Sequence, residues 1–206
     1  MPNPQRCMQA VNELMPILAS KKMKAIMDET QDATYQLEQE LSTTREYVDA
    51  LTFLEEIQTR IDPLEGEAQI ITGMYELMDQ FNVPTPPQDV ALFQTLGGAV
   101  INCRNAIDKA VSERDTNVTK LATLIDKDIE ELEKEVKVIK QDVQDGAILD
   151  IKTDKKKIKS SLERLTTDMD ELQSRAFSYK KYQKTFKIDV TKYEELEQVD
   201  VELRLK

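Results

Sequence analysis

The longest regular pattern of apolar and polar residues lies between Gln88 and Asp145. This stretch contains no proline, and its only glycines are the adjacent pair Gly97 and Gly98. Its apolar residues recur every three or four positions: Phe93, Leu96, Val100, Cys103, Ile107, Val111, Val118, Leu121, Ile125, Leu132, Val136, Ile139 and Val143. The spacing predicts one long helix, close to the 3.5-residue period of a coiled coil. Such a helix is roughly 85 Å long at 1.5 Å per residue, so other helices must cover its apolar stripe.

The middle and the end of this pattern carry further signals. The pattern loosens at residues 113–115, which predicts a bend or a change of packing partner there and not an end. Gly146 suits the left-handed position that closes many helices. A second helix is predicted over residues 155–186, where the heptad spacing is the clearest in the chain: Ile158, Leu162, Leu165, Met169, Leu172, Ala176 and Tyr179. Two long helices with a short glycine-containing link predict an antiparallel hairpin.

The first 61 residues predict two helices of unequal regularity. Prolines at positions 2, 4 and 16 restrict the start of the chain to a short helix over about residues 5–15, or to a partly disordered lead-in. A longer helix is predicted from about residue 20 to residue 61. Thr30, Thr34 and Thr44 fall on its apolar face, so its seam is more polar than that of the long helix.

Two proline-containing stretches are predicted to divide the chain further. Asp62-Pro63-Leu64-Glu65 resembles a cap followed by a first helical turn. A new helix is therefore predicted over residues 64–81, with an apolar face made of Ile70, Ile71, Met74, Leu77, Met78 and Phe81. Pro84-Thr85-Pro86-Pro87 cannot continue a helix, and Thr85 is the predicted cap of the next one. Near the end of the chain, Thr191 and Glu194 have capping-box spacing and predict a last helix.

Together these patterns predict an all-α fold class, an elongated bundle of long antiparallel helices with coiled-coil-like packing. Three segments are predicted: N-terminal helices over residues 1–87, a long helical hairpin over 88–186, and the start of a further helix over 187–206. Aromatic residues make up only 5% of the chain and charged residues 33%. This composition is typical of long helices with thin apolar seams and not of a wide round core.

Charge is unevenly distributed along the chain. The net charge is −11, which argues against a general nucleic-acid or anionic-membrane binder. Residues 1–87 carry 6 Lys/Arg and 15 Asp/Glu, whereas residues 151–206 carry 14 and 11. The single basic cluster consists of Lys152, Lys155, Lys156, Lys157 and Lys159. Two interpretations are open: an exposed helix start, or an electrostatic contact with an acidic partner such as a tubulin surface or an acidic light chain.

The sequence contains few residues suited to catalysis. It has no histidine, no G-x-x-x-x-G-K-[ST] loop and no G-x-G-x-x-G, so we expect no metal, no cofactor and no catalytic residues. The sequence separation of Cys7 and Cys103 matches no metal-binding motif. Two cysteines in a chain of this length are typical of free thiols in a reducing compartment. No signal peptide and no apolar run of about 20 residues is visible. We therefore expect a cytoplasmic protein that does not enter a membrane.

Several short segments, in order, resemble one family. They are REYVDALTFLEEI (residues 45–57), IDPLE (61–65), MYELM (74–78), FNVP (81–84), DEL (170–172) and FKIDVTKYEEL (186–196). In this order the segments resemble the tail, or stem, of a dynein heavy chain, near the point where the stem runs into the linker. The axonemal type is the closer match. The resemblance covers about residues 37–206, and Gly97-Gly98 departs from it because the family often has an aromatic group there.

The resemblance implies a structural role. ATP hydrolysis and microtubule binding would lie in other parts of the polypeptide. This segment would pass force between the motor and its cargo, such as a doublet microtubule of a ciliary axoneme. Its partners would be the linker and motor of the same heavy chain, together with other heavy, intermediate or light chains.

Three other protein classes fit the sequence less well. The first is an unrelated coiled-coil scaffold or tethering protein, for example a spectrin-like array, which should show a recurrent tryptophan that this chain lacks. A membrane-curving dimer should carry a strongly basic face, and the net charge opposes one. A four-helix metalloenzyme would need Glu-x-x-His motifs, which a chain without histidine cannot supply.

Overall fold

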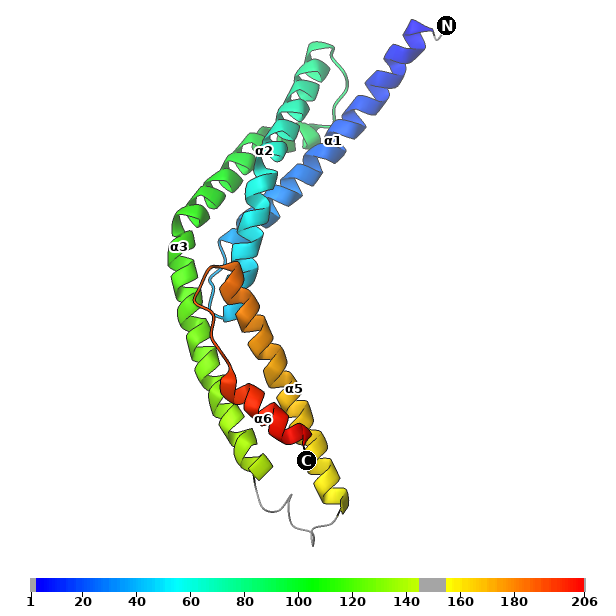
Figure 1. Ribbon diagram of the computed structural model, residues 1–206. Coiled ribbons are helices and arrows are strands. Elements are labelled where there is room, and N and C mark those ends of the chain that lie inside the picture. The colour runs from blue at the N-terminus through cyan, green and yellow to red at the C-terminus, as the bar shows by residue number, and fades with distance from the viewer. Residues whose placement is uncertain (1–2, 145–154, 206) are drawn as a thin grey trace. The chain divides into compact units, whose positions relative to one another are not determined.

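The computed structural model describes residues 3–144 and 155–205 of the 206-residue chain. The helices in this part are α1 (Pro4–Leu37), α2 (Thr44–Gln80), α3 (Pro87–Gln144), α5 (Lys155–Thr185) and α6 (Glu194–Arg204), as Figure 1 shows. The described residues contain no strand, so the predicted all-α class is confirmed. The long helix predicted over residues 88–145 is α3, which has 58 residues.

The internal contacts of the chain define two compact units. The first unit is Met1–Asp115 and the second unit is Thr116–Lys206. The boundary lies inside α3, beside the point where the apolar pattern loosens, and α3 continues through it without an end. The predicted change of packing partner near residues 113–115 is therefore confirmed. The three segments predicted from the sequence follow a different criterion and stay a prediction.

The core of the first unit lies between α1, α2 and the first part of α3. Each of these helices contributes side chains that are almost completely buried: Met23, Ile61, Leu64, Ile71, Met78 and Leu96. In α2 the buried residues alternate in steps of three and four from Leu54 to Met78. That alternation is the heptad spacing of a helix whose one face packs along a partner. Figure 1 shows α1 and α2 lying side by side.

The helix boundaries of the first 80 residues differ from the prediction. α1 continues through Pro16 to Leu37, and α2 continues through Pro63 to Gln80. The short helix over residues 5–15, the helix over 20–61 and the new start at residue 64 were therefore wrong. A proline inside a helix removes one hydrogen bond and costs about 3 kcal/mol. Beside Pro63, the burial of Ile61 and Leu64 offsets that cost, because each buried side chain of this size contributes roughly 1.5–3 kcal/mol.

The break between α1 and α2 is followed by a capping box that the sequence analysis missed. The Thr43 hydroxyl accepts a hydrogen bond from the Glu46 N–H at 3.3 Å, and the Glu46 carboxylate accepts from the N–H groups of Ser42 and Thr43 at 2.8 and 2.9 Å. These backbone hydrogen bonds lower the pKa of Glu46 to about 2. They satisfy amides that the first turn of a helix leaves without partners.

Two other caps differ from the prediction. The Thr85 hydroxyl donates to the Val83 carbonyl at 3.1 Å, and α3 begins at Pro87, so Thr85 is not its cap. The capping box predicted for Thr191 and Glu194 is also wrong. Thr191 instead binds the amide of the buried Gln183: its hydroxyl accepts at 3.0 Å and its N–H donates at 3.1 Å.

The second unit joins the later part of α3 to α5 and α6. The buried residues of α3 here are Leu121, Ile125, Ile129, Leu132, Val136, Ile139 and Val143, and those of α5 include Leu165, Met169, Leu172 and Ala176. Asp142 pairs with Arg164 at 3.1 Å and Glu135 pairs with Arg175 at 2.8 Å. Because the residue numbers rise along one helix as they fall along the other, the predicted antiparallel hairpin is confirmed. The closing role predicted for Gly146 lies outside the described residues.

Candidate functional site

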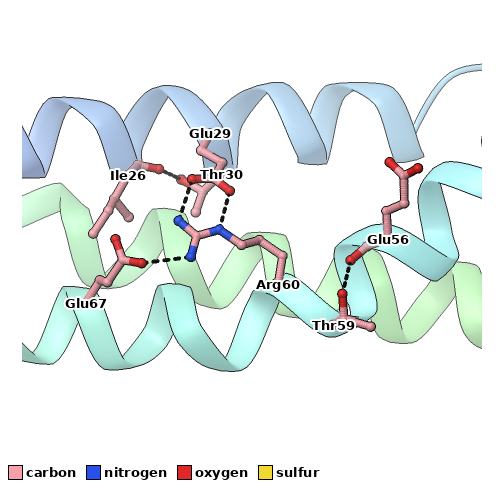
Figure 2. Close-up of polar contacts among 7 residues, drawn as sticks. All are labelled: Ile26, Glu29, Thr30, Glu56, Thr59, Arg60 and Glu67. Carbon is pink, nitrogen blue, oxygen red and sulfur yellow. Dashed lines mark hydrogen bonds and ion pairs between the residues drawn. The ribbon is translucent and has the colours of Figure 1, made fainter.

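The seam between α1 and α2 is crossed by a charged hydrogen-bond group centred on Arg60 (Figure 2). Arg60 in α2 donates from Nε and Nη2 to both carboxylate oxygens of Glu29 in α1, at 2.7 and 3.0 Å. Its Nη1 also donates at 2.7 Å to Glu67, which lies seven residues further along α2. The planar guanidinium can make these bonds only when α1 and α2 keep one relative register.

A second arginine makes an equivalent contact from α3. Arg104 donates from Nε to Glu65 at 2.7 Å and from Nη2 to Asp62 at 2.6 Å, and both carboxylates belong to α2. Asp62, which the sequence predicted to cap a new helix, instead lies inside α2 and is bound by this arginine. The contact therefore fixes α3 against α2 in the same way that Arg60 fixes α1.

These contacts are located around Pro63. Arg60 and Glu67 lie on opposite sides of the proline in sequence, and so do Asp62 and Glu65. We call this group the proline brace, defined as Arg60 and Arg104 with Glu29, Asp62, Glu65 and Glu67. The proline has no N–H, so the backbone ladder of α2 is weakened at this point. The proline brace supplies side-chain bonds across that weak point and to both neighbouring helices.

The charges of the proline brace stabilise one another. Hydrogen bonds from Arg104 and Arg60 hold the pKa values of Glu65 and Glu67 below the ordinary carboxyl value. The bonds to Glu29 and Glu67 raise the pKa of Arg60 further. The guanidinium groups remain about a third exposed, so solvent screens these pairs. Each pair therefore contributes little to stability, and its main effect is to fix the geometry of the helices.

The polar seam predicted from threonines is present in α1. Thr30 is fully buried, and its hydroxyl donates to the Ile26 carbonyl at 2.8 Å, as Figure 2 shows. Thr34 donates to the Thr30 carbonyl at 2.8 Å. Since each hydroxyl bonds to its own helix, neither leaves a buried donor unpaired. Thr44 belongs to α2 and so does not extend this seam.

The second unit has polar contacts of a simpler kind. Arg175 in α5 donates from Nη1 to both oxygens of Glu135 in α3, at 2.9 and 2.8 Å. Lys140 in α3 donates to Glu195 in α6 at 2.9 Å, which lowers the pKa of Glu195. Each cation therefore has one carboxylate partner on one other helix, and α3 is tied to both α5 and α6.

The basic cluster predicted to contact a partner lies at the start of α5. Lys155, Lys156, Lys157 and Lys159 are exposed on the first turns of that helix, and Lys152 lies outside the described residues. Lys159 pairs with Glu163 at 3.7 Å, one turn further along. The role of this cluster in binding stays a prediction.

In the part of the chain that the structure describes, the remaining aromatic and cysteine side chains of note take part in packing. No three His, Cys, Asp or Glu side chains there gather as a group that could hold a metal ion. None of these helices is long and apolar enough to cross a bilayer. Tyr75 stacks on Phe93 with ring centroids 4.3 Å apart, and burial raises the pKa of its hydroxyl. Burial likewise raises the pKa of the Cys103 thiol, which packs in the core of the first unit.

A comparison with known proteins places the chain in a family. Over 205 residues, and thus along its whole length, the chain is 47% identical to human dynein axonemal heavy chain 6. The sequence is that of an axonemal dynein heavy chain segment. The segment spans about 5% of the length of the human protein. No family model matches the chain.

The identity confirms that the short segments between residues 45 and 196 resemble an axonemal dynein heavy chain, and their position in the stem stays a prediction. The identity extends along all five described helices, including α1, for which the short segments carried no signal. An unrelated coiled-coil scaffold would not share a whole-length identity of this size with a dynein heavy chain.

Proposed function

We propose that this dynein segment is a non-catalytic part of the heavy-chain tail, or stem, leading into the linker. In this role it transmits force between the motor and its attachment to a doublet microtubule or other cargo. The observation that carries the proposal is α3, a single helix of 58 residues that contributes buried side chains to the cores of both units. A load applied to one unit would reach the other through a continuous hydrogen-bonded backbone and not through a loop.

The packing of the segment supports this role. A helix of this length rises roughly 87 Å, so it can connect distant points without interruption. Sliding of α1 or α3 along α2 would break the bonds that Arg60 and Arg104 make in the proline brace. Those bonds are short and, for Arg60 with Glu29, bidentate, so they oppose small changes of register.

The dynein identity supports the remaining parts of the proposal. ATP hydrolysis and microtubule binding belong to other regions of the heavy chain. The partners of this segment are the linker and motor of the same chain and other heavy, intermediate or light chains, in the cytoplasm and the axoneme. The exposed Lys155, Lys157 and Lys159 offer positive charge to an acidic partner chain.

The proposal is tested by breaking α3 without disturbing a core. Ser112 is exposed in a stretch of α3 where no side chain is buried, and its hydroxyl donates to the Lys109 carbonyl at 2.6 Å. In the full heavy chain, Ser112→Pro removes a backbone hydrogen bond and kinks the helix, whereas Ser112→Ala keeps it. Stall force in a microtubule-gliding assay is expected to fall for Ser112→Pro alone, while ATP hydrolysis by the motor stays unchanged for both variants.

Two results would contradict the proposal. Equal stall forces for Ser112→Pro and Ser112→Ala would show that the continuity of α3 carries no load. A loss of ATP hydrolysis in Ser112→Pro that accounts for the whole loss of force would instead place the segment in the catalytic cycle. Hydrogen exchange of the two variants is the control, and we expect Ser112→Pro to change exchange only in the residues around the substitution.

A further inference from the structure

The first turns of α1 expose an apolar face. Its large apolar side chains have exposed fractions of 48–67%, and we call them the N-terminal stripe: Met8, Val11, Leu14, Ile17 and Leu18. The opposite side of the same turns is polar, with Gln5, Gln9, Asn12 and Glu13. Apolar and polar residues are thus separated on two sides of one helix, which is the pattern of a helix that packs against a partner. Monomeric proteins rarely leave such a face uncovered.

The N-terminal stripe lies on a different side of α1 from the residues that form the core. At 3.6 residues per turn, the centre of the stripe is rotated by roughly a third of a turn from the side that carries Met23, Ile26 and Thr30. Those three residues are buried against the first unit, whereas Met8 and Leu14 are not. Helices that cover the later part of α1 therefore do not cover its start, and Figure 1 shows the blue start of α1 with no other drawn helix along it.

Positive charge follows the stripe. Lys21 and Lys22 are exposed and continue the same side of the helix, one turn beyond Leu18. Lys24 faces elsewhere and pairs with Asp89 at 3.3 Å. The pKa of Glu67 is lowered mainly by Arg60 and to a smaller extent by Lys22, so Lys22 also lies near one carboxylate of the first unit. A helix that covered the stripe and ran on toward these lysines would gain from carboxylates at that end.

We propose that the N-terminal stripe is the docking site of an acidic amphipathic helix from another region of the same heavy chain. The apolar residues of that helix would cover Met8 to Leu18, and its carboxylates would pair with Lys21 and Lys22. This inference rests on the proposed function in one respect, since it requires a heavy chain that extends beyond this segment. The human relative, of which the segment spans about 5%, is such a chain.

Charge and size favour this occupant over others. A second copy in parallel would place Lys21 and Lys22 beside the same lysines, and each copy carries a net charge of −11. An anionic lipid surface would be repelled by the net negative charge of residues 1–87. The stripe is roughly 15 Å long, so a helix docked on it buries less area than a stable complex between separate chains needs. A helix tethered in the same polypeptide has a high effective concentration and needs less area.

The test uses a zero-length carbodiimide cross-linker, which joins lysine amines directly to carboxylates in contact. The purified full heavy chain, with its associated chains, is cross-linked and its peptides are sequenced by mass spectrometry. We expect Lys21 or Lys22 to join an Asp or Glu of the same heavy chain outside residues 1–206. Lys24 with Asp89 and Lys140 with Glu195 are internal positive controls, because their charged atoms lie 3.3 and 2.9 Å apart.

A pair of matched variants makes the test specific to the stripe. Leu14 is 64% exposed and Ile70, in α2, is 63% exposed, so neither Leu14→Glu nor Ile70→Glu removes a core contact. Leu14→Glu is expected to abolish the Lys21 and Lys22 cross-links and to leave that between Lys24 and Asp89 intact. Ile70→Glu is expected to leave all three cross-links intact.

Cys7 gives a second readout on the same side of α1. It is an exposed free thiol next to Met8, whereas Cys103 is buried. A covering helix is expected to slow alkylation of Cys7 by N-ethylmaleimide in the full heavy chain, and Leu14→Glu is expected to restore fast alkylation, with Cys103 slow throughout.

Several outcomes would overturn the inference. Cross-links from Lys21 or Lys22 to a second copy or to a separate chain would assign the stripe a different occupant. Their absence, when the control cross-link between Lys24 and Asp89 is present, would show that no acidic helix lies there, as would fast alkylation of Cys7. None of these outcomes depends on the stall force of Ser112→Pro, so the force-transmission proposal stands or falls separately.

Discussion

The two units keep their helices in register by different means. In the first unit, Arg60 and Arg104 each bind two carboxylates, and their bonds lie around a proline in the central helix. In the second unit no proline interrupts α3 or α5, and Arg175 and Lys140 each bind one carboxylate. Arginines with two carboxylate partners thus occur where a proline weakens the backbone ladder, and cations with one carboxylate partner occur where the ladder is intact.

The largest expected effect on the free energy of unfolding comes from the apolar cores, because each unit has one. Leu64 in the first unit and Leu132 in the second are both fully buried. Leu64→Ala and Leu132→Ala are each expected to lower the free energy of unfolding by about 2–5 kcal/mol, because each leaves a cavity. Urea unfolding followed by circular dichroism measures both. Leu77→Ala, at a half-exposed position of α2, is the control, and a loss as small as the control's would contradict the assigned cores.

A smaller loss of stability is expected when the buried side-chain amide of Gln183 in the second unit is removed. Gln183→Leu keeps the side-chain volume but leaves the Thr191 N–H without its acceptor. A buried unpaired donor costs about 1–3 kcal/mol, so the unfolding transition shifts to lower urea. The exposed Gln198→Leu is the matched control. An unchanged transition for Gln183→Leu would mean that the contact between Gln183 and Thr191 does not stabilise the chain.

The capping box at the start of α2 is expected to contribute about 1 kcal/mol, as N-caps of this type do. Thr43→Ala is therefore expected to destabilise the first unit, while the exposed Thr52→Ala, within α2, has little effect. Thermal unfolding distinguishes the two. Equal melting temperatures for Thr43→Ala and wild type would exclude a role for this cap.

The same cap predicts a pH dependence. The pKa of Glu46 falls from 4.5 to about 2 on folding, so its stabilising effect is present above pH 4.5 and is lost as the pH falls toward 2. The stability difference between wild type and Glu46→Gln is therefore expected to shrink over that range. A difference that stays constant from pH 6 to pH 2, measured by urea unfolding, would contradict the assigned hydrogen bonds.

The smallest expected effect tests the difference between the units directly. Arg60→Met removes bonds to two carboxylates and Arg175→Met to one, so Arg60→Met is expected to cost more, about 1 kcal/mol after screening. The loss is expected to shrink in high salt. Arg45→Met removes a pair with Asp49 at 3.7 Å on an exposed surface, and this change is expected to have no measurable effect. Equal losses for Arg60→Met and Arg175→Met would remove the distinction between the units.

Much of the fold followed from apolar spacing. The helical class, α3, α5 and their antiparallel pairing were predictable because long heptad-like runs leave few alternatives. The path of α2 was predictable in principle but was missed. Its buried face runs through Leu64, Ala68, Ile71 and Tyr75, whereas the predicted face included Ile70 and Phe81, which are exposed. Small or partly polar residues such as Ala68 and Tyr75 carry that seam past Pro63.

Caps and charged contacts were less predictable. The spacing of Thr43 and Glu46 is as good a capping signal as that of Thr191 and Glu194, yet only the first pair forms a box. Thr191 is hydrogen-bonded to Gln183, eight residues earlier in the chain, and so does not cap α6. The local sequence does not show that Gln183 competes for Thr191. The pairing of Arg104 with α2 likewise depends on packing between residues about 40 apart, so the proline brace had no sequence signal.

The central claim is that one helix, α3, serves both units without interruption. Amide hydrogen exchange of residues 108–120, where no side chain is buried, tests it most directly. Our account predicts that these amides exchange more slowly than an unfolded chain, though faster than amides beside the buried Leu121 and Ile125. Exchange at the unfolded rate there, between protected neighbours, would show that α3 is broken and that the two units are joined by a flexible link.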